Sequence, residues 1–204
     1  MNKKGLQEQA ALFAEALLQM AEENSNLRRR LEDAEREVLT DHLTGLGNSR
    51  HLYIDGARIF DKCAKSGKFF SIFFIDLDYL KSINDRFSHA VGDAALKRLA
   101  NELIVLFGGS TLLVRKSGDE FIVAMPCPSR REFEATRTSL AARMTKMRMT
   151  WKEGVSEKNI YISATSGGIV RRANKTSFAA MLDEADKILL TNKKRRRGDK
   201  KQKS

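Results

Sequence analysis

Two hydrophobic patterns divide the chain at about residue 40. Over residues 1–40, apolar side chains recur with the seven-residue period of a coiled coil, in a seam of five heptads. Heptad position d falls on Leu6, Phe13, Met20, Leu27 and Ala34, and position a falls on Ala10, Leu17, Asn24, Leu31 and Val38. We therefore expect residues 1–40 to form a helical dimerisation stalk.

The polar positions of this segment favour a parallel homodimer. Asn24, the single polar residue at an a position, is best accommodated in a parallel, in-register pair, where two amides can hydrogen-bond each other. The same register pairs Glu23 with Arg28 and Arg30 with Glu35 across the dimer, and both pairs are attractive. The alternative is an amphipathic helix that packs on its own domain.

From Asp41 onward, short helical and extended patterns alternate. Asn48 or Ser49 is placed to cap a helix that runs to about residue 64, and the apolar run at 69–78 indicates a strand. Further helices are expected at about 79–87, 92–107 and 130–149 and from SFAAMLDEADKILL, with strands at 110–116, 120–126 and 160–170. This order of elements predicts an α+β fold, in which helices flank a mixed or antiparallel sheet.

The amino-acid composition indicates a basic protein and a reducing environment. The 204 residues carry a formal net charge of +11, and residues 193–204 contain eight Lys or Arg against one Asp, which suggests anionic partners. We expect residues 198–204 to form a disordered basic tail. Cys63 and Cys127 form no metal-binding or disulfide pattern, so a reduced, cytoplasmic setting fits best.

The sequence as given predicts no membrane segment. No apolar run reaches the roughly 20 residues of a spanning helix, and the start MNKKGLQEQ lacks the core of a signal peptide. A sensor domain upstream of the stalk is compatible with this pattern.

Two acidic positions are candidates for a metal site. Asp76 lies at the end of the expected strand at 69–78, and Asp119 lies at the turn of a hairpin in RKSGDEF. If those strands are neighbours, both carboxylates reach one edge of the sheet, where oxygen ligands favour Mg²⁺ over zinc. The structural alternative is helix capping by Asp76 or Asp78 and a turn role for Asp119.

Five segments together resemble one known family. DHLTGLGN, FIDLDYLKSINDRFSHAVGD, RKSGDEF, ISATSGG and DEADKILL, in this order and spacing, are similar to the GGDEF domain of bacterial diguanylate cyclases, and the match spans about residues 41–197. The resemblance implies a palm-like sheet related to nucleotide cyclases and polymerases. It also implies that two GTP are condensed into cyclic di-GMP with release of two pyrophosphates, between two domains that face each other.

The resemblance assigns roles to individual residues. It implies a metal site for Mg²⁺, with Mn²⁺ as an alternative, at Asp76, the Leu77 carbonyl and Asp119. It implies guanine contacts from Asn84 and Asp93, with His89 within reach of the base or ribose. His89 could equally be a helix-start residue.

Phosphate contacts are implied for a second group of residues. They are Lys81, the backbone of Leu80, and the basic pair Lys193 and Arg197 in the last helix. Asp119 is the hypothesised metal ligand that assists deprotonation of the 3′-OH, with Glu120 as a second acid in the same site.

The sequence departs from the family in three places. Ser117 replaces the first glycine of the signature, which is tolerated if the position needs only an ordinary φ. The positions of the family's RxxD product-inhibition site read Gly108-Gly109-Ser110-Thr111, so we expect no feedback inhibition there. NKKRRRGDK lacks the small residues usual around the basic pair, so Arg195 or Arg196 could replace Arg197.

Two rival functions remain open. A degenerate domain would bind GTP or cyclic di-GMP as a switch without turnover. A coiled-coil protein that binds nucleic acid would use the basic body and tail, but the chain has no basic-aromatic recognition pattern and Trp151 is expected in a loop. We therefore expect no nucleic-acid partner.

Overall fold

The structure is a computed structural model that describes residues 3–109, 111–153 and 156–201 in two units. The first unit, residues 1–39, contains the single helix α1 (Lys3–Leu39). Several of its apolar side chains are exposed, among them the heptad residues Leu17, Met20, Leu27 and Leu31. No helix within the described ranges is long and apolar enough to cross a membrane.

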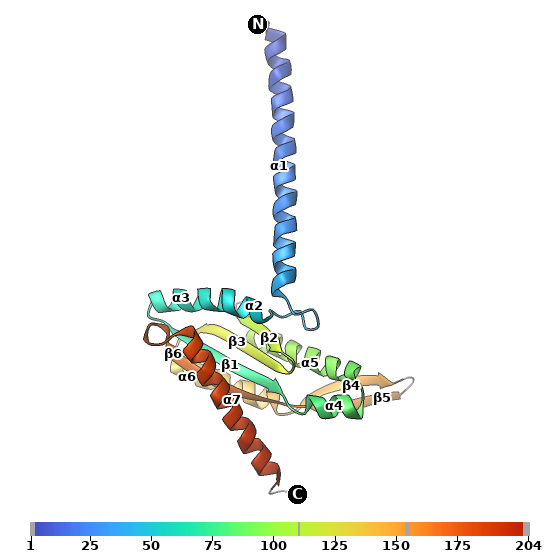
Figure 1. The fold of residues 1–204 in the computed structure, drawn as a ribbon, viewed down its shortest axis with the longest axis vertical. Coiled ribbons are helices and arrows are strands. Elements are labelled where there is room, and N and C mark those ends of the chain that lie inside the picture. Colours follow the sequence, from blue (N-terminus) through green and yellow to red (C-terminus); the bar gives the residue numbers. More distant parts are fainter. Residues whose placement is uncertain (1–2, 110, 154–155, 202–204) are drawn as a thin grey trace. The chain divides into compact units, whose positions relative to one another are not determined.

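The second unit, residues 40–204, is built on a four-stranded sheet (Figure 1). Its strands are β1 (Phe69–Leu77), β2 (Leu112–Ser117), β3 (Glu120–Cys127) and β6 (Ala164–Arg172), in the order β2-β3-β1-β6. Each neighbouring pair is antiparallel. The predicted α+β architecture, with an antiparallel sheet flanked by helices and an N-terminal helix before it, is confirmed.

Helices cover the sheet and connect its strands. A first helical stretch comprises α2 (Ser49–His51), the π-helical turn η1 (Leu52–Gly56) and α3 (Ala57–Lys65), and Asn48 caps it by accepting from the His51 N–H at 3.1 Å. The others are α4 (Leu80–Arg86), α5 (His89–Phe107), α6 (Arg130–Met144), the 3₁₀ turn η2 (Ala173–Lys175) and α7 (Phe178–Lys201).

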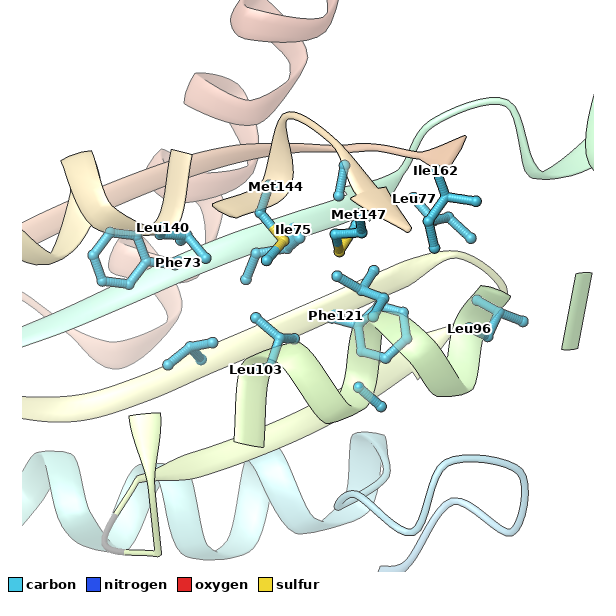
Figure 2. Close-up of a cluster of buried hydrophobic side chains, with 14 of the residues drawn as sticks. Phe73, Ile75, Leu77, Leu96, Leu103, Phe121, Leu140, Met144, Met147 and Ile162 are labelled. Atoms are coloured by element: carbon cyan, nitrogen blue, oxygen red, sulfur yellow. The ribbon is translucent and has the colours of Figure 1, made fainter. Parts of the chain in front are cut away.

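Strand β1 separates two hydrophobic cores because its side chains alternate between the faces of the sheet. Phe73, Ile75 and Leu77 belong to one core, which includes residues of α5 and α6 (Figure 2). Phe70, Ile72 and Phe74 belong to the other, which includes residues of α3 and α7. The even-numbered residues of β1 therefore face α7, and Asp76 is the last of them.

The expected helix at 130–149 was too long, and a strand had been missed. Helix α6 ends at Met144, and β4 (Met147–Glu153) pairs with β5 (Ser156–Ile162) in a separate two-stranded sheet. Met147 and Met149 are buried, whereas the residues that follow each of them are exposed. Trp151 lies in β4 and packs on the core, so its expected loop position was also wrong.

The expected strand at 160–170 is two strands that belong to different sheets. Ser163 separates β5 from β6 and belongs to neither strand. Its carbonyl accepts from the Asp78 N–H at 2.8 Å. At the end of the chain, α7 continues through residue 198, where the tail was expected to begin, and reaches Lys201.

Substitution of Gly167 tests how closely α7 packs on β6. A Cβ at this position would lie 2.2 Å from the Leu189 nitrogen and 2.6 Å from its Cα. Because backbone cannot move aside as a flexible side chain can, we expect Gly167→Ala to lower the free energy of unfolding by about 1–3 kcal/mol in urea denaturation. Gly109→Ala, where a Cβ would meet no atom within 4 Å, is the control. Equal stability of the two variants would contradict this packing.

Candidate functional site

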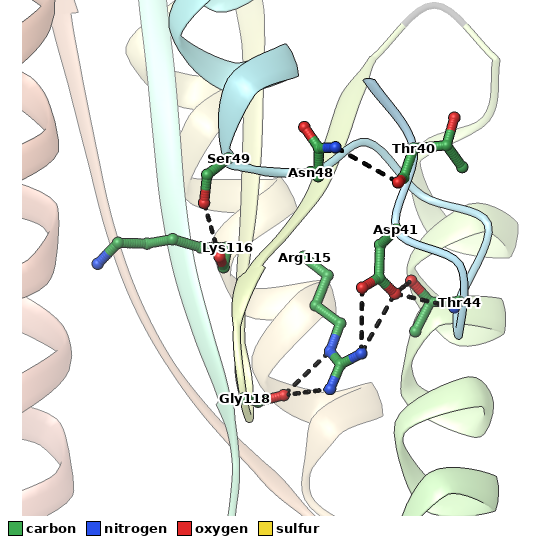
Figure 3. Close-up of polar contacts among 8 residues, drawn as sticks. All are labelled: Thr40, Asp41, Thr44, Asn48, Ser49, Arg115, Lys116 and Gly118. Carbon is green, nitrogen blue, oxygen red and sulfur yellow. Dashed lines mark hydrogen bonds and ion pairs between the residues drawn. The ribbon is translucent and has the colours of Figure 1, made fainter. Parts of the chain in front are cut away.

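Arg115 fastens the hairpin turn to the first loop of the second unit (Figure 3). Its Nη1 donates to both carboxylate oxygens of Asp41 at 3.2 Å, and its Nε and Nη2 donate to the Gly118 carbonyl at 3.0 and 2.8 Å. Burial would raise the pKa of Asp41, but hydrogen bonds from Thr44 and the Arg115 guanidinium outweigh it and hold that pKa below its ordinary value. The Arg115 side chain thus joins the loop at Asp41 to the hairpin turn at Gly118.

Ser117 fits the turn without backbone strain. Gly118 supplies the positive φ of the turn, at +48°, whereas Ser117 is not among the residues with positive φ. The Ser117 hydroxyl donates to Glu120 Oε2 at 3.1 Å, and the Lys116 ammonium donates to the same oxygen at 3.3 Å. The carboxylate of Glu120 is therefore engaged by its own hairpin.

Strand pairing brings three polar residues into one row at the end of the sheet. Asp76 lies opposite Glu120 of β3 and opposite Thr165 of β6. Cross-strand partners share a face of the sheet, so all three lie on the face that α7 covers. The turn residue Asp119 is fixed beside this row because its carbonyl accepts from the Leu77 N–H at 3.1 Å.

A cavity of about 270 Å³ opens at this end of the sheet. Its walls come from the end of β1, the loop into α4, the hairpin turn, β6 and α7. The lining residues are Asp76, Leu77, Asp78, Tyr79, Leu80, Lys81, Ser82, Asp119, Thr165, Lys193 and Arg196. The structure thus brings together six of the residues expected from the sequence: Asp76, Leu77, Leu80, Lys81, Asp119 and Lys193.

The loop into α4 has an unusual backbone. Tyr79 has φ 61° and ψ 29°, and within the described ranges it alone among non-glycine residues has a positive φ. Such a conformation costs of order 1–3 kcal/mol and is found more often at binding sites. It turns the chain sharply between Asp78 and the first helical residue, Leu80, so that the loop forms one wall of the cavity.

Asp76 carries the strongest electrostatic perturbation of the cavity. Only 4% of the residue is exposed, and burial raises its pKa to about 6. The bond from the Lys193 ammonium opposes this rise, while the nearby charges of Asp119 and Asp78 add to it. The Lys193 ammonium alone therefore does not bring the pKa of this carboxylate back to its ordinary value.

The donor set suits a hard divalent cation. Asp76 and Asp119 offer carboxylate oxygens, and Leu77, which also lines the cavity, has a backbone carbonyl. Mg²⁺ is commonly held by one or two carboxylates, with its other positions left for water and phosphates. No cluster of three or more His, Cys, Asp or Glu that could hold a metal occurs in the described part of the chain.

Four expected site residues with described side chains lie outside the cavity lining: Glu120 on the hairpin, and Asn84, His89 and Asp93 on α4 and the first turns of α5. Asn84 is half-buried, and its Oδ1 is buried without a hydrogen-bond partner among the described residues. Gly92 makes room for it, since a Cβ there would lie 1.8 Å from this oxygen. His89 is the first residue of α5 and is exposed, and Asp93 is exposed one turn later.

The basic end of α7 differs from the expected arrangement. Lys193 lines the cavity and pairs with Asp76. The side chain of Arg197 lies outside the described residues, whereas Arg196 lines the cavity and donates to Asp78 at 2.6 Å. The roles of Asp78, Thr165 and Arg196 were missed, although the three consecutive arginines at 195–197 left Arg196 as an alternative.

Comparison with known proteins identifies the family of this domain. Residues 38–199 match the family model described as diguanylate cyclase, GGDEF domain. The chain is 39% identical over 85 residues to the probable diguanylate cyclase DgcC of Escherichia coli, covering 42% of this chain and 23% of that protein. It is 27% identical over 167 residues to the diguanylate cyclase VdcA of Vibrio cholerae, covering 82% of this chain and 48% of that protein.

A solved structure shows the same fold. The coiled coil and GGDEF domain of DgcB from Caulobacter crescentus, in complex with c-di-GMP, superposes with a TM-score of 0.77 at 22% sequence identity. The match covers 87% of this chain and 92% of that one. The chain spans between about a quarter and a half of the two curated relatives.

Replacing Asp76 with Asn should change the pH dependence of stability. The pKa of Asp76 rises from 3.8 to about 6 on folding, so its contribution to stability is complete below pH 4 and is lost as the pH rises through 6. We expect the free energy of unfolding of Asp76→Asn, relative to wild type, to increase between pH 4 and pH 7 by about 1–3 kcal/mol. Urea denaturation at several pH values without divalent cations measures this difference.

Asp85→Asn, at an exposed position of α4, serves as the matched control for the loss of one carboxylate. Its free energy of unfolding is measured over the same pH range. A flat difference between Asp76→Asn and wild type would show that burial does not perturb the Asp76 carboxylate.

Proposed function

Because the chain belongs to the GGDEF family of diguanylate cyclases, we propose that it condenses two GTP into cyclic di-GMP and two pyrophosphates as a homodimer. The observation that carries this proposal is the convergence of Asp76, Asp119, Lys81 and Lys193 around one cavity of about 270 Å³. Two acids and two cations at one end of a sheet suit a nucleoside triphosphate and its divalent ion. A GTP substrate is compatible with the cytoplasmic setting that we expect from the sequence.

The triphosphate is proposed to lie between the loop into α4 and the end of α7. Lys81 and Lys193 line this cavity, and the backbone at Leu80 follows the sharp turn at Tyr79. Lys193 pairs with Asp76 in the structure and would exchange this partner for a phosphate oxygen. Arg197 remains a proposed phosphate contact, and Arg196 is the described arginine on this wall.

The guanine base is proposed to bind beside α4 and α5. The unpartnered Oδ1 of Asn84 is an acceptor, and the exposed carboxylate of Asp93 can accept from guanine N1–H and the 2-amino group. Adenine has no donor at N1, so this arrangement would select GTP. His89 at the start of α5 is a proposed contact to the base or ribose.

Asp76, Asp119 and the Leu77 carbonyl would hold Mg²⁺, or Mn²⁺ in its place. The ion, when bound, supplies charge neutralisation at the transferring phosphate. The 3′-oxygen of one GTP bonds to the α-phosphorus of the other, the bond to the β-phosphate breaks, and pyrophosphate leaves. Asp119 is proposed to take the proton of the 3′-OH. Glu120 lies in the row beside Asp76 and is the proposed second acid.

A degenerate, non-catalytic domain is the main alternative, and Ser117 is its chief support. The ordinary φ of Ser117 and the exposure of its side chain favour tolerance of the substitution. The expected ligands at positions 76 and 119 are intact and line the cavity. Binding of GTP or cyclic di-GMP as a switch would leave these two acids without a catalytic role.

Nucleic-acid binding is the third candidate function. It rests on the basic residues near the end of α7, and it would be favoured by salt-sensitive DNA binding that is lost when residues 193–204 are deleted. Feedback control through the family's RxxD position is not expected. Gly108, Gly109 and Thr111 carry neither guanidinium nor carboxylate, and residue 110, the fourth position, lies outside the described residues.

The proposed activity predicts a defined product. Purified protein incubated with GTP and Mg²⁺ should yield cyclic di-GMP by mass spectrometry, and Asp119→Ala should reduce turnover by about 100-fold or more, because it removes both a metal ligand and the proposed base. Substantial turnover by Asp119→Ala would show that Asp119 is not an essential metal ligand or base.

Ser117 variants separate an active domain from a degenerate one. Ser117→Ala removes the hydroxyl and keeps the backbone restriction, whereas Ser117→Gly restores the glycine of the family signature. Both should stay within about threefold of wild-type turnover, because an exposed hydrogen bond contributes little. No product from wild type, with product from Ser117→Gly, would identify a degenerate domain.

The stalk is proposed to form a parallel dimer that brings two cavities together. Inserting seven residues between 31 and 40 keeps the heptad phase, whereas inserting four residues rotates one end of the helix relative to the other. We expect the seven-residue insertion to retain most activity and the four-residue insertion to lose about tenfold or more. Equal activity of the two proteins, both dimeric by light scattering, would contradict control by stalk phase.

A further inference from the structure

We propose that Asp78 is a positioning residue that fixes the C-terminal half of α7 through Arg196, and so holds Lys193 at the phosphate end of the cavity. This inference rests on the proposed function, because it gives Lys193 a phosphate to bind. It assigns the second aspartate of FIDLD a role distinct from the metal ligand Asp76.

Asp78 is engaged on several sides. Its carboxylate accepts from the Ser163 hydroxyl at 2.8 Å, the Thr165 hydroxyl at 2.7 Å and Arg196 Nη1 at 2.6 Å, and its N–H donates to the Ser163 carbonyl at 2.8 Å. Only 9% of its side chain is exposed. With three donors on its two oxygens, Asp78 is occupied by protein groups and is poorly available to a metal.

Arg196 also contacts the protein at more than one point. Its Nη1 also donates to the Ala164 carbonyl at 3.1 Å and to the Thr165 hydroxyl at 3.2 Å. The guanidinium thus lies where the chain leaves β5 and enters β6, and it ties α7 to the point at which the two sheets separate. A hydrogen-bonded ion pair of this kind is stronger and more directional than an exposed one.

Apolar packing of α7 ends before the residues that face the cavity. Met181, Leu182, Ala185 and Leu189 are buried, whereas Leu190 is 48% exposed, and no buried residue follows Leu189 in the described part of the helix. Beyond that point polar contacts to the sheet take over: Asn192 Nδ2 to the Ser166 carbonyl at 2.8 Å, Lys193 to Asp76, and Arg196 to Asp78.

Substrate binding would affect the Lys193–Asp76 pair and the Arg196–Asp78 pair differently. Among the described residues, the carboxylate partner of Lys193 is Asp76, which is a proposed metal ligand. A cation and a triphosphate would therefore compete for both members of this pair. Asp78 and Arg196 have protein partners that substrate does not replace, so their contact can keep the helix in place while Lys193 changes partner.

The test compares two ion pairs made by α7: Arg196 with Asp78 in the loop after β1, and Glu184 with Arg171 of β6, nearer the start of the helix. Asp78→Asn and Arg196→Met break the pair beside the cavity, Arg196→Lys keeps a cation there, and Glu184→Gln breaks the distant pair between Glu184 and Arg171. Binding of α,β-methylene GTP with Mg²⁺ is measured by calorimetry, and KM and kcat are measured where turnover occurs. Hydrogen exchange reports the amides of residues 190–196.

We expect Asp78→Asn and Arg196→Met to weaken analogue binding and raise KM by about tenfold, with faster exchange at 190–196 and a smaller change in kcat. Arg196→Lys should recover binding to within about threefold, and Glu184→Gln should match wild type. Arg196 is about one-third exposed, so Arg196→Met keeps the test usable if Asp78→Asn fails to fold.

Unchanged analogue binding in both Asp78→Asn and Arg196→Met would overturn the inference, and so would an equal loss in Glu184→Gln. Failure of the proposed function is a different result. In that case wild type binds the analogue and makes no product, and the binding and exchange measurements still decide the role of Asp78.

Discussion

Asp76 is a carboxylate buried at the end of the central strand, and the residues around it leave it short of positive charge. The pKa of this group rises to about 6 because burial and two other acids outweigh the bond from Lys193. Strand alternation points Asp76 to the face that α7 covers, and the hairpin turn brings Asp119 next to it. Two acids are thus close together in a protein with a strongly basic sequence. A divalent cation between them and phosphates on the surrounding lysines would satisfy both kinds of charge.

Prediction from the sequence succeeded where local pattern and tertiary structure agree. The apolar run of β1 and the turn at Ser117-Gly118 have strong local signals, so the hairpin and central strand were located to within a few residues. Strand β4 was missed because Met147, Arg148 and Met149 are compatible with a helix, and only pairing with β5 decides otherwise. Arg196 could not be chosen over its neighbours because each residue turns a helix by about 100°, and the face that meets Asp78 depends on packing.

Two glycines also shape the region of the site, because the absence of a side chain lets neighbouring atoms approach the backbone closely. Gly92 lets Asn84 lie against α5, and Gly167 lets the backbone of α7 approach β6 near Leu189. A sequence pattern shows that glycines are present at these positions but not which atoms they admit. Ser117 is the opposite case, because a missing glycine suggested a defect. The structure places the positive φ at Gly118 instead, so the substitution alters a hydrogen bond to Glu120 and leaves the turn intact.

The size of the cavity bears on why a dimer is proposed. One cavity of about 270 Å³ collects a single set of acids and lysines, and we propose that it holds one triphosphate and its cation. The proposed reaction joins the 3′-oxygen of one GTP to the α-phosphorus of another, so both nucleotides must be held at once and in line. A second copy supplies the second site without any new residue in this chain. In the proposed dimer, the heptad residues exposed along α1 would give two copies a surface on which to associate, and a parallel pair would present the two domains from the same end of the stalk.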